Sequence, residues 1–179
     1  MSTAEPRSQS QGSPFWRFSL RFYREPDVAE ACIRLQEEAG VDVNLLLFVL
    51  WHATHKRALS ATEVAELERR IGAWRDATVV PLRALRRALK SPPALVAPAA
   101  AELFRTRIKA VELEAERLQQ EAMYEFVRAA PWGRAAASPA AAARANISAY
   151  EAIAGAAFPG PAVETLLAAL RRLELTTEE

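Results

Sequence analysis

The chain has 179 residues, about half of them hydrophobic and a quarter charged, and its formal net charge is +1. This composition is typical of one soluble globular domain and provides no overall positive charge for binding nucleic acid or an anionic membrane. Its most apolar run, Leu45 to Trp51, is far shorter than the ~20 residues of a membrane-spanning helix. Cys32 is the single cysteine, which excludes an internal disulfide and favours the reducing cytoplasm.

Residues 1–13 are polar, so we expect a disordered tail without the apolar core of a signal peptide. Ser13-Pro14 then pairs a cap with a proline, which predicts a helix from Phe15 to about Arg24. The aromatic residues of this helix, among them Trp16 and Tyr23, are either core residues or a binding platform. We favour the core, because aromatic side chains dominate buried area.

A second helix is expected from Pro26 to about Ala39, with Cys32 on its apolar face as an inert buried thiol. Gly40 can end this helix in a left-handed conformation. The following run is rich in Leu and has no second strand to pair with, so it predicts a helix from Asp42 to about His55. Because this helix is apolar on nearly every side, the other helices should bury it.

Asp42 and Asn44 are the two polar residues at the start of this central helix. Either can cap the helix by accepting a backbone N–H bond, and we favour this interpretation because helix starts require such residues. The alternative is a ligand site that combines them with Trp16 and Tyr23 in a pocket between the first and central helices.

His52 and His55 stand three residues apart, as in some metal sites. They are the only histidines, however, and a protein metal site needs three or four convergent ligands. The chain also has no Gly-rich phosphate loop, no Gly-x-Ser-x-Gly elbow and no Cys-x-x-Cys pair. We therefore expect no metal and no cofactor, and we favour a non-enzymatic role.

Ser60 to Glu63 forms a capping box that starts the next helix. We expect Pro81 to kink or break this helix within Asp76 to Val80, because proline lacks the backbone donor. The inward face is predicted to consist of Val64, Leu67, Ile71 and Trp74.

The helix expected from Pro81 to Lys90 should turn its leucines inward and its cations outward. The leucines are Leu82, Leu85 and Leu89, and the cations are Arg83, Arg86, Arg87 and Lys90. These cations are our candidate partner-binding residues, suited to an acidic protein partner or to phosphates. A solvated basic face is the alternative. Nucleic acid is disfavoured, because proteins that bind it usually have a clearly basic domain.

Residues 91–98 contain three prolines and predict a loop or hinge, followed by the longest helix, from Ala99 to about Ala129. Apolar residues recur along it at spacings of three and four, which predicts a seam that packs on the core or on a partner helix. The seam consists of Phe104, Ile108, Val111, Ala115, Leu118, Ala122 and Phe126. Its glutamates, Glu112 to Glu121, lack the Glu-x-x-His pair of di-metal bundles and should form a solvated face.

Pro131-Trp132-Gly133 ends the long helix, and Ser138-Pro139 starts an Ala-rich helix to about Ala154. Gly155 to Pro161 is a break before a final amphipathic helix, Ala162 to Leu173. Residues 176–179 should fray.

Several runs of the sequence are distinctive: Phe15-Trp16-x-Phe18-Ser19-Leu20, Gly40 to Phe48 with Trp51, Trp74-Arg75, Val80 to Arg83, and Glu112 to Glu116. Together they resemble a family of uncharacterised bacterial proteins, mainly proteobacterial, known as a domain of unknown function. The resemblance covers about residues 14 to 125. It implies a bacterial cytoplasmic protein and carries over no activity, cofactor or site.

We predict a single all-α domain over residues 14–175, an irregular bundle of six to eight helices around the central buried helix. The favoured function is a protein-interaction or regulatory module, and assembly of several copies stays open. The alternative is an enzyme or small-ligand-binding protein with a site at Asp42 and Asn44. An exposed apolar stripe on the long helix would favour the first, and a cleft with unsatisfied polar atoms would favour the second.

Overall fold

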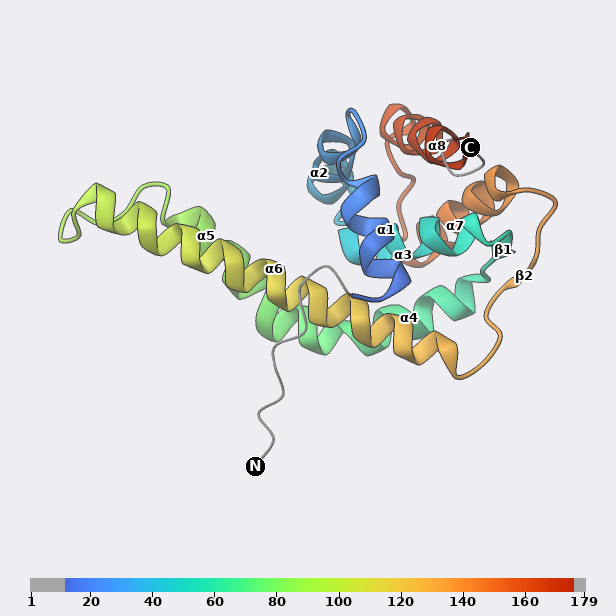
Figure 1. Ribbon diagram of the computed structural model, residues 1–179, viewed down its shortest axis with the longest axis horizontal. Coiled ribbons are helices and arrows are strands. Elements are labelled where there is room, and N and C mark those ends of the chain that lie inside the picture. The colour runs from blue at the N-terminus through green and yellow to red at the C-terminus, as the bar shows by residue number, and fades with distance from the viewer. Residues whose placement is uncertain (1–11, 176–179) are drawn as a thin grey trace.

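Helix α3 (Val43–Thr54) lies at the centre of the computed structural model, which describes residues 12–175 (Figure 1). Its residues from Asn44 to Ala53 are all buried. The surrounding elements are α1 (Pro14–Phe22), α2 (Val28–Ala39), β1 (Arg57–Ala58), α4 (Ala61–Trp74), the π-helix η2 (Arg75–Val79), α5 (Val80–Ala88), α6 (Pro98–Arg128), β2 (Arg134–Ala135), α7 (Pro139–Ala154) and α8 (Gly160–Leu175). The predicted all-α bundle around a central buried helix is confirmed. Of the predicted terminal segments, residues 1–11 and 176–179 lie outside the described residues.

The helix starts follow local signals in the sequence. The Asp42 carboxylate accepts the backbone N–H of Leu45, which confirms the capping role that we favoured for Asp42. Ser60 and Glu63 form the predicted capping box at the start of α4. Ser13 caps α1 and Ser138 caps α7, each followed by proline in the first turn.

Helix α2 starts two residues later than predicted. Asp27 precedes it with a φ of 64°, a left-handed conformation that a helix cannot contain. The prediction that the helix begins at Pro26 is therefore wrong. Gly40 ends α2 in the predicted left-handed conformation, and Cys32 on its inner face is buried.

The most extensive contact of α3 is with α7, whose alanines allow close approach. Asn146 of α7 is fully buried and joins three segments. Its amide nitrogen donates to the carbonyls of Val49 (2.8 Å) and Arg57 (3.1 Å), and its side-chain oxygen accepts from the N–H of Leu59 (2.6 Å). Next to it, β1 and β2 form an antiparallel pair, with Arg57 opposite Ala135, that the sequence did not predict.

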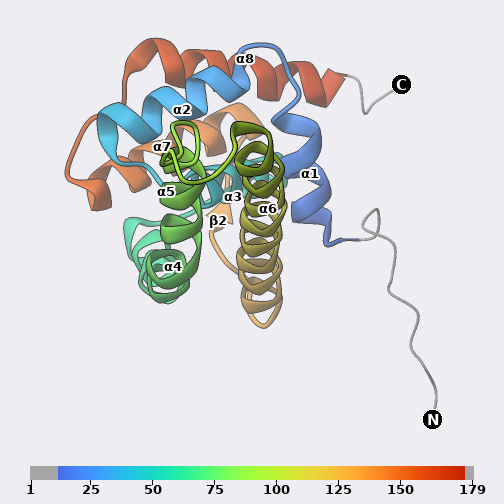
Figure 2. The same cartoon turned by 90° about the vertical axis from the view of Figure 1, so that its left-hand side faces the viewer.

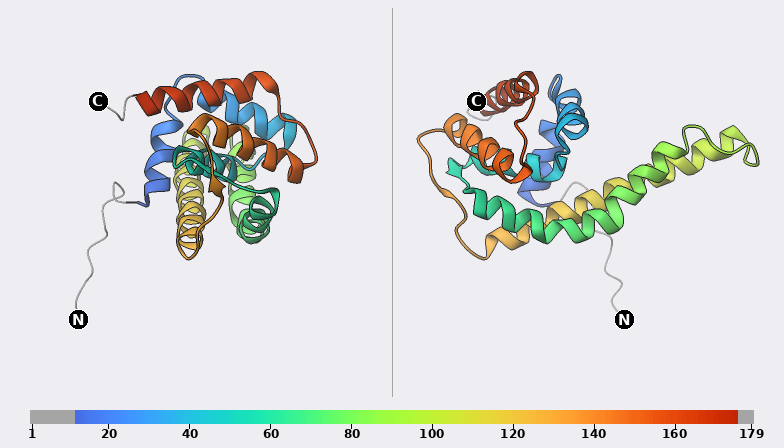
Figure 3. Two further views of the ribbon diagram at one scale, coloured as in Figure 1. Left: turned by 90° about the vertical axis from the view of Figure 1, so that its right-hand side faces the viewer. Right: turned by 180° about the vertical axis from the view of Figure 1, so that it is seen from behind.

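The interruption predicted near Pro81 is a π-helical turn, η2, and the helical path continues from α4 through η2 into α5 (Figure 3). The N–H of Val80 bonds to the carbonyl of Arg75, five residues back, and Pro81, which has no N–H to donate, follows it in the first turn of α5. The helix is therefore wider at η2 but is not broken there.

Helix α5 and the first half of α6 project from the other helices as an antiparallel pair (Figures 1 and 2). We call residues 80–112 the arm, and the described residues outside it the body. No residue of α5 is buried, and Leu85, predicted to face inward, is 41% exposed. At 1.5 Å per residue, the 31 residues of α6 span about 46 Å, so one helix serves both body and arm. No helix described within residues 12–175 has the length and apolar character to cross a membrane.

Helix α6 is rotated about its axis relative to the prediction. Of the predicted seam, Phe104, Val111 and Leu118 are 45–50% exposed. The residues that it buries are Ala101, Glu112, Ala115, Gln119, Gln120, Met123 and Val127. Three of these are polar, so α6 packs through a mixed polar face and leaves an apolar stripe in contact with solvent. Trp74, also predicted to face inward, is 40% exposed, although its indole N–H donates to the carbonyl of Ala115.

Candidate functional site

A polar cleft of about 340 Å³ opens where the end of α2 and the start of α3 face η2, α5 and α7. Its polar lining comes from Gln36, Asp42, Asn44, Glu68, Arg75, Arg83 and Tyr150. Asp42 and Asn44 therefore line a cleft, as the ligand-site hypothesis requires. The location predicted for it is wrong, because α1 contributes no residue to the lining and neither Trp16 nor Tyr23 belongs to it.

Asp42 is held from several directions. One carboxylate oxygen caps α3 through Leu45, and the other accepts from the amide of Gln119 (3.3 Å) and, more weakly, from Arg75 (3.5 Å). The backbone N–H of Asp42 donates to the hydroxyl of Tyr150 (2.9 Å). The residue is thus both a helix cap and part of a buried polar cluster, so the two interpretations of its role do not exclude each other.

Arg75 is placed in the cleft by η2, and π-helical turns occur frequently at functional sites. Its guanidinium donates to Glu68 (2.6 Å) and to Asp76 (3.0 Å). Burial disfavours the charge, but the hydrogen bonds to Glu68 and Asp76 outweigh it and raise the pKa of Arg75 further. The side chain is therefore a fixed cation.

Three buried side-chain oxygens of this polar cluster lack a donor among the described residues, and one of them, on Glu68, belongs to the cleft lining. Asn44 accepts from the amide of Gln120 (2.8 Å), as Asp42 does from Gln119. Within residues 12–175, the side-chain oxygens of Gln119 and Gln120 and one carboxylate oxygen of Glu68 are buried without a hydrogen-bond partner. All three are acceptors, which leaves negative potential uncompensated on this side of the cluster.

A second group of charges continues from the cleft into the base of the arm. Glu112, only 5% exposed, accepts from both Arg83 (3.2 Å) and Arg86. Arg83 also donates to Glu116 (2.6 Å). The prediction that Arg83 and Arg86 point outward is wrong, and so is the solvated face predicted for Glu112 and Glu116. These ion pairs join α5, which has no buried residue, to α6.

The pKa values of the two glutamates are shifted in opposite directions. Burial disfavours the charge of Glu112, but hydrogen bonds from Arg86 and Arg83 outweigh it and lower the pKa of that carboxyl. Burial raises the pKa of Glu116, against the effect of Arg83, and the nearby charges of Glu112 and Asp42 raise it further. Glu116 is therefore protonated at a higher pH than Glu112.

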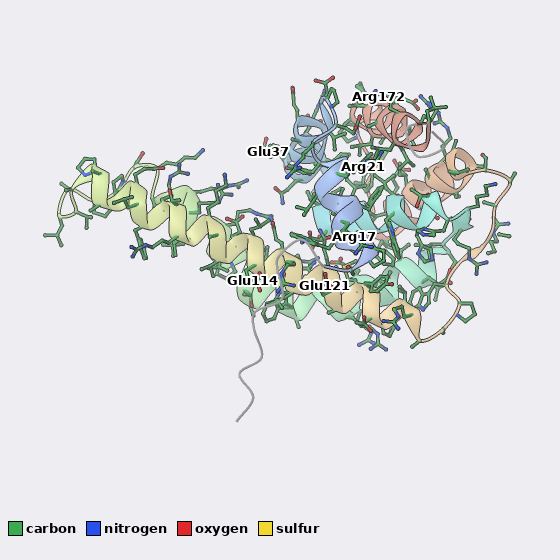
Figure 4. The ribbon with its side chains drawn as sticks, in the orientation of Figure 1. Arg17, Arg21, Glu37, Glu114, Glu121 and Arg172 are labelled. Carbon is green, nitrogen blue, oxygen red and sulfur yellow. The ribbon has the colours of Figure 1, made fainter. Side chains whose placement is uncertain are left out.

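The aromatic residues of α1 are mainly core, as we predicted. Phe15, Trp16 and Phe22 are buried, whereas Tyr23 ends the helix at 39% exposure. Burial raises the pKa of Tyr23, with contributions from the nearby charges of Cys32 and Glu116. Figure 4 shows Arg17 and Arg21 on α1, where it passes in front of the half of α6 that carries Glu114 and Glu121.

The arm carries the strongest concentration of charge. It contains seven Lys and Arg residues and two Glu residues, a net charge of +5 in a chain of +1. Four of its cations are exposed and have no ion-pair partner among the described residues: Arg87, Lys90, Arg107 and Lys109. Between them lie exposed apolar side chains: Val80, Leu85, Leu95, Val96, Leu103, Phe104 and Val111. The arm thus presents both an electrostatic and an apolar surface.

The two histidines have ordinary structural contacts. His52 is 8% exposed, stacks on Phe48 and contacts the carbonyl of Trp132 through Nε2 (3.2 Å). Burial lowers the pKa of His52, so the ring is neutral near pH 7. His55 contacts the carbonyl of Trp51 (3.0 Å). In the part of the chain that the structure describes, no group of three or more His, Cys, Asp and Glu side chains is arranged to hold a metal ion.

A family model described as "Protein of unknown function (DUF2390)" matches residues 14–123, well over half of the chain. The chain belongs to this family. The DUF2390 match includes the arm and every polar residue of the cleft except Tyr150, and it ends within α6. Neither the curated proteins nor the solved structures include a match to the chain.

Sequence reasoning missed Glu68, Arg75, Gln119, Gln120 and Tyr150, which complete the cleft and its cluster. One signal was present for the base of the arm. Arg83 and Arg86 stand three apart and Glu112 and Glu116 four apart, so each pair occupies one face of its helix, and the short 91–98 loop makes the helices antiparallel neighbours. For the other five residues no local pattern exists, because their partners lie 33 or more positions away along the chain or belong to a turn of unusual geometry.

Proposed function

We propose that this protein is an interaction module of the bacterial cytoplasm and that the arm docks an acidic segment of a protein partner. The observation that carries the proposal is the separation of charge: the arm has a net charge of +5, which leaves −4 for the remainder of the chain. A basic surface of this kind attracts an acidic partner and orients its approach. The cytoplasmic location is supported by Cys32, a single cysteine that lies buried as a free thiol.

The apolar residues favour a protein partner over nucleic acid. Phe104 and Val111 are not among the buried residues of α6: each is about half exposed, and Leu103 is 68% exposed. Exposed apolar side chains rimmed by charges are typical of protein interfaces, in which apolar anchors supply affinity and charges supply orientation. Phosphate recognition would use the cations and leave these side chains without a role.

The proposal is tested by purification of the tagged protein from its native host with two double variants. Arg87→Glu with Arg107→Glu reverses two unpaired cations of the arm. Arg24→Glu with Arg134→Glu reverses two exposed cations of the body and is the matched control. Arg83 and Arg86 are left unchanged, because their ion pairs hold α5 on α6.

We expect a stoichiometric protein partner that is retained by the control, lost by the arm variant and bound more weakly at high salt when both proteins are purified. An isolated peptide with the sequence of the partner's acidic segment should also bind the arm. Retention of the same partner by the arm variant would contradict the proposal. Loss of all binding after nuclease treatment would assign the arm to nucleic acid instead.

A further inference from the structure

We propose that the polar cleft is a binding site for a small molecule that presents a positively charged amine. The cleft lies where the start of α3 meets η2 and α7, and only Val80 and Arg83, at the base of the arm, belong to both the arm and the cleft lining. No residue of the proposal belongs to the four unpaired cations of the arm.

The size and shape of the cleft fit a small molecule. Its volume of about 340 Å³ lies at the lower end of the range of small-molecule sites, which run from about 300 to 1,000 Å³. Apolar walls are provided by Val41, Val79, Val80 and Ile153, and the polar groups come from six different elements or their caps. A few convergent polar groups on an apolar wall are the usual composition of a ligand site.

The charge of the cluster selects the sign of the ligand. The cleft lining holds two carboxylates, Asp42 and Glu68, and two guanidinium groups, Arg75 and Arg83. Both arginines are already committed to carboxylates outside the lining, Arg75 to Asp76 and Arg83 to Glu112 and Glu116. The carboxylates of the cleft and its neighbouring ion pairs therefore outnumber the guanidinium groups, which favours a cationic ligand over an anionic one.

Buried acceptor oxygens without a donor also favour a positively charged ligand. Within residues 12–175, one carboxylate oxygen of Glu68, a residue of the cleft lining, is buried without a hydrogen-bond partner, and so are the side-chain oxygens of Gln119 and Gln120, which bond to Asp42 and Asn44 but do not line the cleft. What this region lacks is a donor, and an ammonium group provides three N–H donors together with a positive charge. A carboxylate or phosphate ligand would add acceptors to a region that already has too many.

Three four-carbon probes of equal length test the charge requirement: 1,4-diaminobutane, 1,4-butanediol and succinate. Binding is measured by titration calorimetry, and the backbone amide NMR signals of Val43 and Asn44 report binding at the cleft. Asp42→Asn removes the charge but retains a good helix cap, and Glu68→Gln retains the hydrogen bond to Arg75 without the charge. Glu164→Gln is the matched control, since Glu164 is exposed and pairs with Arg144 far from the cleft.

The diamine should bind and shift the signals of Val43 and Asn44, whereas the diol and succinate should not. Asp42→Asn and Glu68→Gln should each weaken diamine binding about tenfold or more, and the Glu164→Gln control should bind as the unchanged protein does. Equal binding of all three probes, preferential binding of succinate, or binding of none of them would overturn the inference. So would diamine binding that Glu164→Gln weakens as much as Glu68→Gln does. Failure of the arm experiment would leave these outcomes unchanged.

Discussion

The body and the arm are parts of one chain that are stabilised in different ways. In the body, α3 is buried over ten successive residues and its contacts are mostly apolar. In the arm, α5 buries no residue and is joined to α6 by the ion pairs of Arg83 and Arg86 with Glu112 and Glu116. Apolar burial is the dominant stabilising term in folding, whereas ion pairs contribute less and respond to salt and pH.

This difference suggests that the body maintains the fold, whereas the arm provides a binding surface. The body can fix the geometry of the cleft, because most of the cleft residues lie on helices that pack on the hydrophobic core. The arm can change its contacts without unfolding the body, because few apolar side chains are buried by it. Regions of low local stability are the ones from which binding surfaces are commonly drawn. The following predictions test the comparison, from the largest effect to the smallest.

The same substitution should have very different effects in the two regions. Phe48→Ala removes a fully buried ring that packs on Phe15 and Trp51, and should lower the free energy of unfolding by about 3–5 kcal/mol. Phe104→Ala in the arm removes a ring that is 49% exposed and should cost about 1 kcal/mol or less. Urea unfolding followed by circular dichroism measures both values, and similar costs would contradict the distinction.

Removal of Glu112 should have the largest effect of any arm residue. Glu112→Ala leaves Arg83 and Arg86 without their shared carboxylate, and should cost about 2–3 kcal/mol, less than a fully buried pair because both arginines reach water. Glu114→Ala is the matched control, since Glu114 is about half exposed and pairs only with Arg117. It should change the free energy of unfolding by less than about 0.5 kcal/mol. Equal effects in the two variants would show that the ion pairs do not hold the arm.

The same ion pairs should make the arm sensitive to acid. The pKa of Glu112 is lowered in the folded protein, so its stabilising contribution is present above the ordinary carboxyl pKa of 4.5 and is lost as the pH falls through the lower folded value. Glu116 has the opposite sign: its raised pKa favours the folded state at low pH, and this contribution is lost as the pH rises through its folded value. Unfolding titrations from pH 3 to 6 should therefore show a loss of stability on the acid side that Glu112→Gln makes smaller. Identical pH profiles for the two proteins would contradict the assignment.

The sequence predicted features whose determinants are local. Ser60 with Glu63 and Ser138 with Pro139 fix helix starts through residues at most three positions apart. The run from Leu45 to Trp51 is apolar on every side, so its burial could be predicted without knowing which helices cover it. The rotation of α6 could not be predicted, because the partners of its buried polar residues are far away in the chain. Gln119 is buried only because Asp42 lies opposite it, 77 positions earlier. A pattern of apolar spacing contains no information of that kind.

The cleft was located only in part for the same reason. Asp42 and Asn44 were found because polar residues at the start of an apolar helix are conspicuous. Arg75 was missed because a π-helical turn places it in the cleft, and Tyr150 because its hydrogen-bond partner Asp42 lies 108 positions away in the chain. Trp16 was included because aromatic clusters occur both in cores and in binding sites, and the structure places it in the core.

The smallest effect concerns Cys32 in the body. Burial raises the pKa of this thiol to about 12, so it stays protonated and unreactive at pH 8. Alkylation by iodoacetamide in the native protein should be about a hundredfold slower than in guanidinium chloride, because it requires opening of α2. Phe104→Ala should not change the rate. Rapid alkylation of the native protein would show that the body opens as easily as we expect the arm to open.

Hydrogen exchange of individual amides in α3 and α5, at salt concentrations of about 0.01 M and about 1 M, compares the two regions most directly. We predict that α3 opens only with global unfolding at both concentrations, whereas α5 opens at a lower free energy that falls further in 1 M salt, where the Arg83, Arg86 and Glu112 ion pairs are screened. Equal opening free energies in α3 and α5, both insensitive to salt, would contradict the conclusion that ion pairs hold α5 on α6 whereas apolar burial holds α3 in the body.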